Sequence, residues 1–333
     1  MKIVVLDGHG LNPGDLSWDG IARLGELTVY PRTSDDEVAA HAADAEILLT
    51  NKTPITDERM ERLPHLKYIG VLATGYNVVD TEAARRRHIP VTNIPAYSTQ
   101  SVAQMVFALL LAVTNRVEHY ARENREGRWS RNPDFCYWDT PLVELAGKRM
   151  GIVGLGHTGM ATARIALAFG MDVTALTSKD AGSLPEGIRK AASTDELFAT
   201  CDVVSLNCPL TPDTYHMINK ESLSRMKDGV ILINCARGGL TDINALVDGI
   251  ESEKIGALGM DTVEGEEGIV HEDRRTDIIS NRNWFYLHQF RNVIMTQHMA
   301  FYTKEAVDSM VRCGVEGIVQ MEKTGTCPTM LTK

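Results

Sequence analysis

Three polar residues in the second half of the chain each follow a short apolar segment. They are Arg237, Asp261 and His298, and Glu266 follows shortly after Asp261. Ligands of open parallel sheets bind beyond the carboxyl ends of the strands, so we expect these residues on one side of one sheet. An arginine can bind a carboxylate and polarise a carbonyl oxygen, and a carboxylate favours the protonated form of a histidine that donates a proton near neutrality. Such a set meets the needs of 2-oxo acid reduction.

Each of these residues also has a purely structural interpretation. Arg237, in the sequence Arg-Gly-Gly, can cap a strand end or pair with a surface acid, and His298 is one of ten histidines. The acidic run from Glu264 through Glu266 to Glu267 is typical of a solvated loop. Their joint occurrence beyond three separate strand ends favours the catalytic interpretation.

A glycine-rich turn at residues 154–159 predicts the cofactor. It reads Gly-Leu-Gly-His-Thr-Gly and lies between a strand-like segment, residues 149–153, and a helix-like segment, residues 160–169. The first glycine permits the tight turn, the second lets backbone approach a pyrophosphate, and the third allows close packing of helix on strand. Free N–H groups at the start of the helix bind the anion. The expected dinucleotide contacts are Gly154, Gly156, His157, Thr158 and Gly159.

Short apolar segments alternate with helix-compatible segments along the chain, which predicts parallel α/β units. The order of the later series is typical of a doubly wound, Rossmann nucleotide domain. The early strand-like segments are residues 3–6, 46–49, 67–72 and 89–93, and the later ones are residues 149–153, 172–176, 202–206, 230–234, 256–260 and 292–296.

A helix is predicted over residues 102–117, and residues 127–141 form an irregular segment rich in aromatic side chains. Such a segment is typical of a packed arm or a subunit contact, so we expect a homodimer. A second helix is predicted over residues 303–322 and can return to the first unit.

The expected domains follow from this return of the chain. Residues 1–100 and 298–333 are predicted to form one discontinuous domain. Residues 101–297 are predicted to form the dinucleotide-binding domain.

Composition bounds the possible partners. The chain has 333 residues, 44% of them hydrophobic, and a net charge of −10, which argues against nucleic acid or an anionic membrane as partner and favours a small molecule. Met1 leads directly into a strand-like segment, and no apolar run reaches the ~18 residues of a membrane span, so we expect a cytoplasmic protein. The six cysteines form no Cys-x-x-Cys pair, which predicts reduced thiols and no metal site.

Four motifs resemble those of the D-isomer-specific 2-hydroxyacid dehydrogenases, over essentially the whole chain. They are Gly-Leu-Gly-His-Thr-Gly at 154–159, Asn-Cys-Ala-Arg-Gly-Gly at 234–239, Gly-Met-Asp at 259–261 and Gln-His-Met-Ala at 297–300. The resemblance implies a Rossmann domain with a smaller, flavodoxin-like α/β domain that binds substrate. It also implies NAD(P)H-dependent reduction of a small 2-oxo acid to a D-2-hydroxy acid.

The resemblance also implies residue roles. Arg237 would orient the substrate, His298 would protonate the carbonyl oxygen, and Glu266 would support His298. Glu266 is chosen over its neighbours because the family's glutamate lies five residues after the strand-ending aspartate, here Asp261. That aspartate is expected to contact the nicotinamide carboxamide. Further expected cofactor contacts are Thr177, Pro209, Thr214, Cys235 and Ala236.

The family binds the substrate carboxylate on backbone after the third strand of its first domain. In this chain the matching residues are Ala73, Thr74 and Gly75. Tyr97 and Tyr302 are expected pocket walls, with packed core tyrosines as the equal alternative.

Two parts of the chain resemble different branches of the family. Residues 1–225 resemble glycerate dehydrogenase (hydroxypyruvate reductase), whereas the chain from Lys227 onward resembles D-lactate dehydrogenases, including those of vancomycin-resistance clusters. Glycerate-type relatives usually carry Pro-His at the histidine, and this chain has Gln297 before His298. We expect hydroxypyruvate as substrate and D-glycerate as product, with pyruvate and D-lactate as the alternative.

The choice of cofactor stays open at one position. An Asp or Glu after the second strand of the nucleotide domain normally binds the ribose hydroxyls and repels a 2′-phosphate. Thr177 occupies that position here, followed by Ser178 and Lys179. We expect NAD, with NADP not excluded.

Two other classes share parts of this sequence pattern. A nucleotide-sensing binding protein, like the family's transcriptional corepressors, can keep the same Arg, Glu and His, and would show no turnover with a panel of 2-oxo acids. A nucleoside-dependent methyltransferase can share the glycine turn but would not quench nicotinamide fluorescence.

Overall fold

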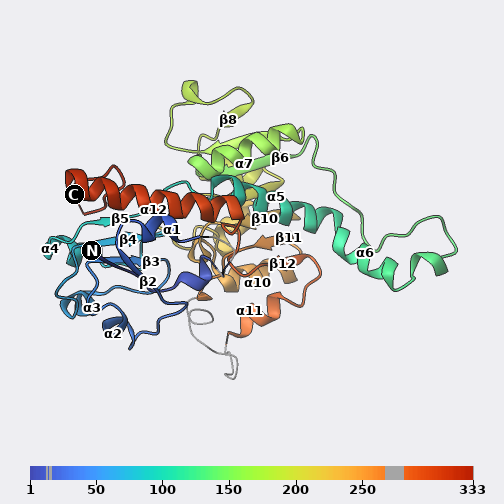
Figure 1. The fold of residues 1–333 in the computed structure, drawn as a ribbon. Coiled ribbons are helices and arrows are strands. Elements are labelled where there is room, and N and C mark those ends of the chain that lie inside the picture. Colours follow the sequence, from blue (N-terminus) through green and yellow to red (C-terminus); the bar gives the residue numbers. More distant parts are fainter. Residues whose placement is uncertain (13, 15–16, 267–280, 333) are drawn as a thin grey trace. The chain divides into compact units, whose positions relative to one another are not determined.

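Two parallel sheets organise the chain, and each belongs to its own unit (Figure 1). The computed structural model describes residues 1–12, 14, 17–266 and 281–332. Within them, the first unit consists of residues 1–98 and 302–332, and the second contains residues 99–266 and 281–301. The expected domain boundary at residue 298 therefore differs from this division, because Met299 and Ala300 are bound by their backbone to the second unit.

The first unit has a five-stranded sheet in the order β2-β1-β3-β4-β5, with all neighbours parallel. This is the flavodoxin-like order, as the sequence predicted. The elements are β1 (Lys2–Val5), α1 (Asp19–Ala22), β2 (Glu26–Val29), α2 (Val38–His41), β3 (Ile47–Thr50), α3 (Asp57–Glu61), β4 (Tyr68–Val71), α4 (Thr81–Arg86), β5 (Val91–Thr92) and α12 (Lys304–Thr324).

The last helix, α12, completes the first unit. Thr303 caps its start by accepting a hydrogen bond from the Ala306 amide, and Gly325, in the left-handed conformation, ends it. Small residues let the helix approach the sheet, since a Cβ added at Gly317 would lie 3.1 Å from the Tyr68 hydroxyl oxygen. Burial raises the pKa of that tyrosine to about 12, so its hydroxyl stays neutral and bonds to Thr92.

The second unit has a seven-stranded parallel sheet in the order β12-β11-β10-β9-β6-β7-β8. Counted from β6, six of these strands follow the Rossmann order 3-2-1-4-5-6, as predicted. The elements are α5 (Thr99–Asn115), α6 (Val117–Arg125), β6 (Arg149–Val153), α7 (His157–Ala168), β7 (Asp172–Leu176), β8 (Ile188–Lys190), α8 (Thr194–Thr200), β9 (Val203–Leu206), α9 (Lys220–Arg225), β10 (Val230–Asn234), α10 (Ile243–Glu251), β11 (Ile255–Met260), α11 (Arg282–Leu287) and β12 (Val293–Met295).

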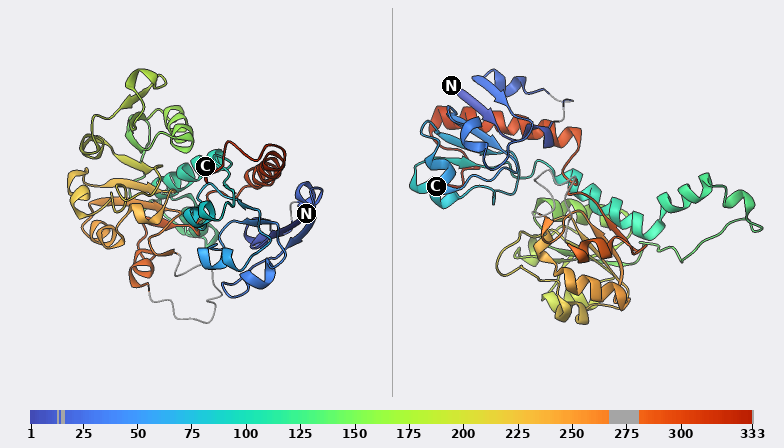
Figure 2. Two further views of the ribbon diagram at one scale, coloured as in Figure 1. Left: turned by 90° about the vertical axis from the view of Figure 1, so that its left-hand side faces the viewer. Right: turned by 90° about the horizontal axis from the view of Figure 1, so that it is seen from below.

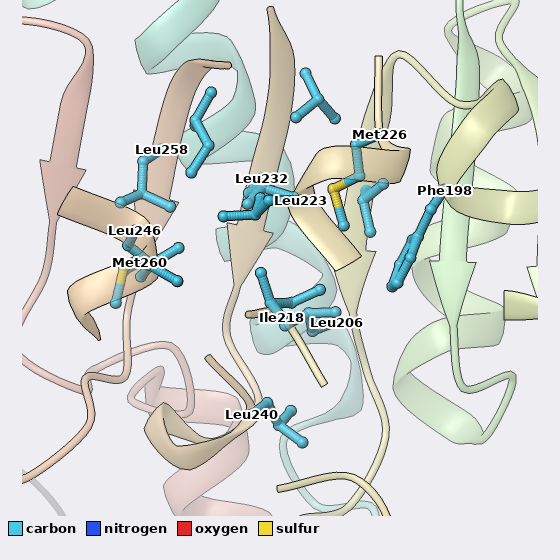
Figure 3. Close-up of a cluster of buried hydrophobic side chains, with 14 of the residues drawn as sticks. Phe198, Leu206, Ile218, Leu223, Met226, Leu232, Leu240, Leu246, Leu258 and Met260 are labelled. Carbon is cyan, nitrogen blue, oxygen red and sulfur yellow. The ribbon is translucent and has the colours of Figure 1, made fainter. Parts of the chain in front are cut away.

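A hydrophobic core lies on each face of the second sheet. Successive side chains of a strand point to opposite faces, so Leu232 of β10 packs into one core and its neighbour Ile233 into the other. Helices α8, α9 and α10 cover the first face, where Phe198 and Leu246 are fully buried (Figure 3). Helices α5 and α7 cover the second face. Burial on both faces explains why these strands are continuously apolar.

The helix predicted over residues 102–117 instead ends at Asn115. Arg116 adopts a left-handed φ of 51°, which breaks the helix before α6 begins. Helix α6 and the irregular segment after it project from the rest of the second unit (Figures 1 and 2). Within the described residues no single helix has the length and apolarity to cross a membrane. Helices α5 and α6 have that length and apolarity only when taken together, and they are bent by 56° where they meet.

Candidate active site

The glycine turn has the geometry that the motif predicts. Gly154 has a φ of +91°, and a Cβ there would lie 2.9 Å from the carbonyl carbon of Asn207. Gly156 caps α7, and His157 is the first residue of that helix. A Cβ at Gly159 would lie 1.9 Å from the Gly154 carbonyl oxygen, so only glycine lets the helix pack this closely on the turn.

A cavity of about 570 Å³ lies at this turn, beyond the carboxyl ends of β6, β7 and β9. Among the expected cofactor contacts, five line it: Gly154, Gly156, Thr177, Pro209 and Thr214. Pro209 and Thr214 belong to the wall after β9, and Asn207, Cys208 and Met217, which also line the cavity there, were not among the expected contacts. For Asn207 and Cys208 the signal was their position directly after β9, a strand next to β6 in the sheet.

The far end of the cavity carries no negative charge among the described lining residues. Thr177 and Ser178 offer hydroxyls, and Lys179 is the charged residue of the lining. The turn is held by a hydrogen bond from the Lys179 amide to Thr177 Oγ1 (3.2 Å), and Lys190 Nζ donates to the Lys179 carbonyl (2.7 Å). A carboxylate that would repel a 2′-phosphate is therefore missing from this part of the cavity.

Arg237 follows β10 and starts a single turn of 3-10 helix. Its side chain is half-buried, and its Nη1 donates to the Ala236 carbonyl (2.6 Å). Asn234 Nδ2 donates to the Arg237 carbonyl (2.9 Å), which fixes the backbone of the turn. No carboxylate pairs with this guanidinium among the residues that the structure describes, so its charge is available to an anion.

His298 and Glu266 are in contact. His298 Nδ1 and Glu266 Oε1 are 2.6 Å apart, with 27% and 18% of the two side chains exposed. Glu266 Oε2 accepts a hydrogen bond from the Val263 amide (3.0 Å), which orients the carboxylate. Because the Glu266 carboxylate accepts a hydrogen bond from Nδ1–H, the opposite nitrogen, Nε2, is the one that can transfer a proton.

Asp261 is buried, with 1% of its surface exposed. Its carboxylate accepts hydrogen bonds from the amides of Met299 (2.9 Å) and Ala300 (2.8 Å) and from Thr296 Oγ1 (2.6 Å). These bonds hold the segment that carries His298, whose φ is 53°. The structure thus gives Asp261 a positioning role, and its expected contact with nicotinamide stays a prediction. Cys235 is also buried, which raises the pKa of its thiol.

The expected substrate-binding residues belong to the first unit and follow β4. Ala73 is buried and its carbonyl accepts from the Ile94 amide (3.0 Å), while Thr74 Oγ1 donates to the Ile94 carbonyl (3.0 Å). Gly75 follows at the same strand end. The last two expected contacts, Tyr97 and Tyr302, pack against the core that includes α12.

Asp7 holds the strand end next to these residues, and the sequence analysis missed it. Its carboxylate accepts from the backbone amides of Asn51 (2.9 Å), Lys52 (2.6 Å) and Thr53 (2.8 Å). Asn51 Nδ2 in turn donates to the Leu72 carbonyl (2.6 Å), directly before Ala73. The sequence signal for Asp7 was a lone acid at the end of the first strand. Three amides at the end of the neighbouring strand β3 need an acceptor there.

A comparison with known proteins decides the family. The profile of the NAD binding domain of the D-isomer specific 2-hydroxyacid dehydrogenases matches residues 107–300. The chain belongs to this family. This D-2-hydroxyacid dehydrogenase is 44% identical over 326 residues to a hydroxypyruvate reductase of Blautia hydrogenotrophica. The aligned residues cover 97% of each chain. Because the alignment covers 97% of the chain, this similarity includes both residues 1–225 and the part from Lys227 onward.

Two further relatives belong to the lactate branch. The D-lactate dehydrogenase of Escherichia coli is 33% identical over 267 residues, 80% of this chain and 79% of that one. The solved structure of the D-lactate dehydrogenase of Aquifex aeolicus, complexed with NAD and lactic acid, has a TM-score of 0.85 and 28% identity, covering 100% of this chain and 99% of that one. The dehydrogenase is therefore an oxidoreductase with an NAD-binding domain.

The cavity of this dehydrogenase fits the dinucleotide. Gly156 leaves open space, since an added Cβ would meet no atom within 4 Å, and the amides at the start of α7 are available to a pyrophosphate. Thr177 and Ser178 supply hydrogen-bonding groups at the far end of the cavity for a ribose. These residues would hold NAD.

Gly156→Ala tests this fit without disturbing the fold. Because the new methyl group meets no protein atom, we expect an unchanged Tm, whereas the dissociation constant for NADH should rise about tenfold, or about 1.4 kcal/mol, as the methyl group occupies the approach to the pyrophosphate. Gly182→Ala is the matched control, since its Cβ also meets nothing within 4 Å and it lies outside the cavity. Equal NADH affinity in both variants, measured by fluorescence titration, would contradict the assignment.

Proposed function

We propose that this dehydrogenase reduces hydroxypyruvate to D-glycerate with NADH. The choice of hydroxypyruvate as substrate rests on the 44% identity, over 97% of both chains, to a protein named hydroxypyruvate reductase. Pyruvate, with D-lactate as product, is the second candidate because two relatives in the comparison are D-lactate dehydrogenases.

Arg237 would bind the substrate in this proposal. Its half-buried guanidinium carries a positive charge that no described carboxylate neutralises, and its planar fork matches the carboxylate and carbonyl oxygens of a 2-oxo acid. The charge also stabilises the negative charge that develops on the carbonyl oxygen during reduction. The backbone at Ala73, Thr74 and Gly75 would bind the substrate carboxylate, as the family resemblance implies.

His298 would supply the proton. NADH supplies the hydride when it is bound. His298 donates the Nε2 proton to the carbonyl oxygen, while the 2.6 Å contact of Nδ1 with Glu266 holds the ring and stabilises its positive charge. In the reverse direction the same nitrogen accepts the proton of the hydroxyl group.

The proposed substrate is tested by comparing kcat/KM for hydroxypyruvate, pyruvate and glyoxylate with the same enzyme. We expect the highest value for hydroxypyruvate, by about tenfold, since a site that hydrogen-bonds a substrate hydroxyl disfavours the analogue without it. A higher kcat/KM for pyruvate would make pyruvate the preferred substrate in place of hydroxypyruvate. The same assays with NADPH test the cofactor, and a strong preference for NADPH would overturn the choice of NADH.

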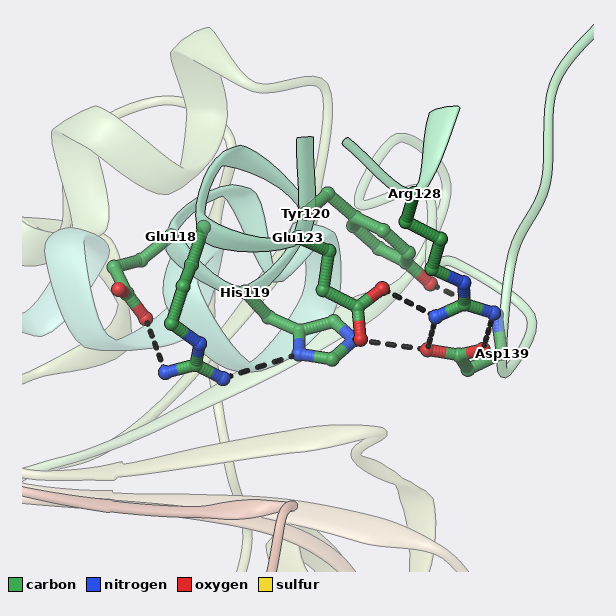
Figure 4. Close-up of polar contacts among 7 residues, drawn as sticks. Glu118, His119, Tyr120, Glu123, Arg128 and Asp139 are labelled. Carbon is green, nitrogen blue, oxygen red and sulfur yellow. Dashed lines mark hydrogen bonds and ion pairs between the residues drawn. The ribbon is translucent and has the colours of Figure 1, made fainter. Parts of the chain in front are cut away.

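We also propose that two copies of the chain associate through the arm formed by α6 and residues 126–141. Its aromatic side chains are strongly exposed, Phe135 by 90% and Trp138 by 65%, which is unusual for large apolar groups without a partner. A charged cluster joins α6 to the returning chain of the arm at Asp139 (Figure 4). There Arg128 binds both Glu123 and Asp139, and His119 Nε2 lies 2.8 Å from Asp139 Oδ2.

Both carboxylates of this cluster already have partners within it. His119, Glu123 and Asp139 are close enough to hold a metal ion, but the Arg128 guanidinium already binds both carboxylates. The bonds from Arg128, and then from His119, hold the pKa of Asp139 well below its usual range. Because the folded pKa is depressed, the stabilisation by this carboxylate is complete above its unfolded pKa and is lost only as the pH falls through the depressed value.

Trp138→Ser tests the proposed dimer. Light scattering of the unmodified protein should give twice the chain mass of 36.7 kDa, and Trp138→Ser should shift the protein toward the single-chain mass, because the interface loses its aromatic contact. Phe285→Ser, at an aromatic residue with 45% exposure on α11, is the matched control and should keep the larger mass. A single-chain mass for the unmodified protein would contradict the proposal.

A further inference from the structure

Glu264 joins three separate segments of the second unit. Its Oε1 pairs with His216 Nε2 and accepts a hydrogen bond from the Tyr215 hydroxyl (3.2 Å). Its Oε2 accepts from the amide of Ile243, the first residue of α10 (3.2 Å). Both carboxylate oxygens are therefore occupied, which the acidic run in the sequence did not reveal.

His216 lies between two residues that line the dinucleotide cavity, although it does not line the cavity itself. Its neighbours Thr214 and Met217 line the cavity, together with Cys208 and Pro209. An internal hydrogen bond holds this wall together: Thr214 Oγ1 donates to the Pro209 carbonyl (2.8 Å). His216 has a φ of 50°, an unfavourable conformation for a residue with a Cβ, and its amide donates to the Gly239 carbonyl (2.9 Å).

Glu264 belongs to the turn that carries the catalytic carboxylate. Gly265, with a φ of +76°, separates it from Glu266, and Glu266 contacts His298. The turn also packs directly on the Arg237 segment, since a Cβ added at Gly238 would lie 2.1 Å from the carbonyl carbon of Val263. A displacement of this turn would therefore reach both Arg237 and Glu266.

We propose that Glu264 and His216 are positioning residues that fix the cavity wall at residues 208–217 relative to the turn carrying Glu266. The two side chains are 23% and 28% exposed, so the pair is partly shielded from solvent, unlike the surface pair of Lys254 with Asp228, whose aspartate is 92% exposed. The roles of Glu266 and His298 rest on the proposed function, whereas the effect on the cavity wall does not.

The experiment measures NADH binding directly, without turnover, by titration of nicotinamide fluorescence. Glu264→Ala and His216→Ala are each expected to raise the dissociation constant about tenfold, because the wall loses its side-chain link to the turn that carries Glu266. The double variant should bind NADH no more weakly than either single variant, since all three lose the same interaction. Glu264→Gln loses the charge and keeps one acceptor oxygen, which can serve either Tyr215 or Ile243 but not both, so it should recover only part of the affinity.

Lys254→Ala is the control, because it breaks an ion pair at the surface of the same unit and should leave NADH affinity unchanged. Single variants that bind NADH as the unmodified protein does would overturn the proposal. Losses that simply add in the double variant, in step with Tm, would also overturn it, since they indicate a merely structural role. A failure of the proposed reaction is seen separately, as normal NADH binding without turnover of any 2-oxo acid.

Discussion

His298→Gln is expected to lower kcat for 2-oxo acid reduction by about 10²–10⁴-fold, the usual contribution of a positioned general acid. Glutamine fills similar space but has no titrating proton to give to the carbonyl oxygen. NADH affinity should be unchanged, because His298 is not part of the cavity lining around the glycine turn. Stopped-flow measurement of a single turnover, together with NADH titration, checks both expectations.

Glu266→Gln is the companion variant for this prediction. It keeps an oxygen near His298 Nδ1 and removes the negative charge, so kcat should fall less than in His298→Gln. Combining the two changes should cost little more than His298→Gln alone, because the pair acts as a unit. Near-normal turnover in His298→Gln would remove the residue from the mechanism.

Arg237→Lys is expected to lower kcat/KM by roughly thirtyfold, or about 2 kcal/mol, the lower end of the cost of breaking a buried charged contact. Lysine keeps the positive charge but loses the planar fork that binds two oxygens at once. Because the carbonyl oxygen gains charge in the transition state, we expect kcat to fall and KM to rise together. Steady-state kinetics on hydroxypyruvate at saturating NADH measure both.

Arg225→Lys is the matched control for this change. Arg225 pairs with Asp195 and Glu221 at the surface of the same unit, so the same chemical change there should leave kcat/KM within about twofold. If Arg237→Lys is equally harmless, the guanidinium does not bind the substrate.

The sheets were predictable because their strands are buried. Segments such as β10 are apolar up to their last residue, Asn234, and the succession of strands and helices predicts parallel sheets. The two missed strands, β2 and β8, lie at sheet edges and are only half-buried, so their apolar signal is weak. Arg116 was missed because a left-handed residue other than glycine leaves no composition signal.

The candidate site was predictable where a motif fixes the backbone. The glycine turn specifies its own geometry, and the offset of five residues from Asp261 selected Glu266, which does contact His298. The links that depend on tertiary contacts were not predictable. Examples are the hydrogen bonds that Asp261 accepts from the Met299 and Ala300 amides and the pairing of Glu264 with His216, 48 residues apart. Neither separation corresponds to a helix or strand period.

Tracing the hydride tests the proposed reaction. The enzyme is incubated with hydroxypyruvate and NADH that carries deuterium at both C4 positions, and the product is examined for label and configuration. We predict D-glycerate with one deuterium at C2, because hydride is transferred to the carbonyl carbon while His298 supplies an unlabelled proton to the oxygen. No oxidation of NADH with any 2-oxo acid, or a product of L configuration, would contradict the account.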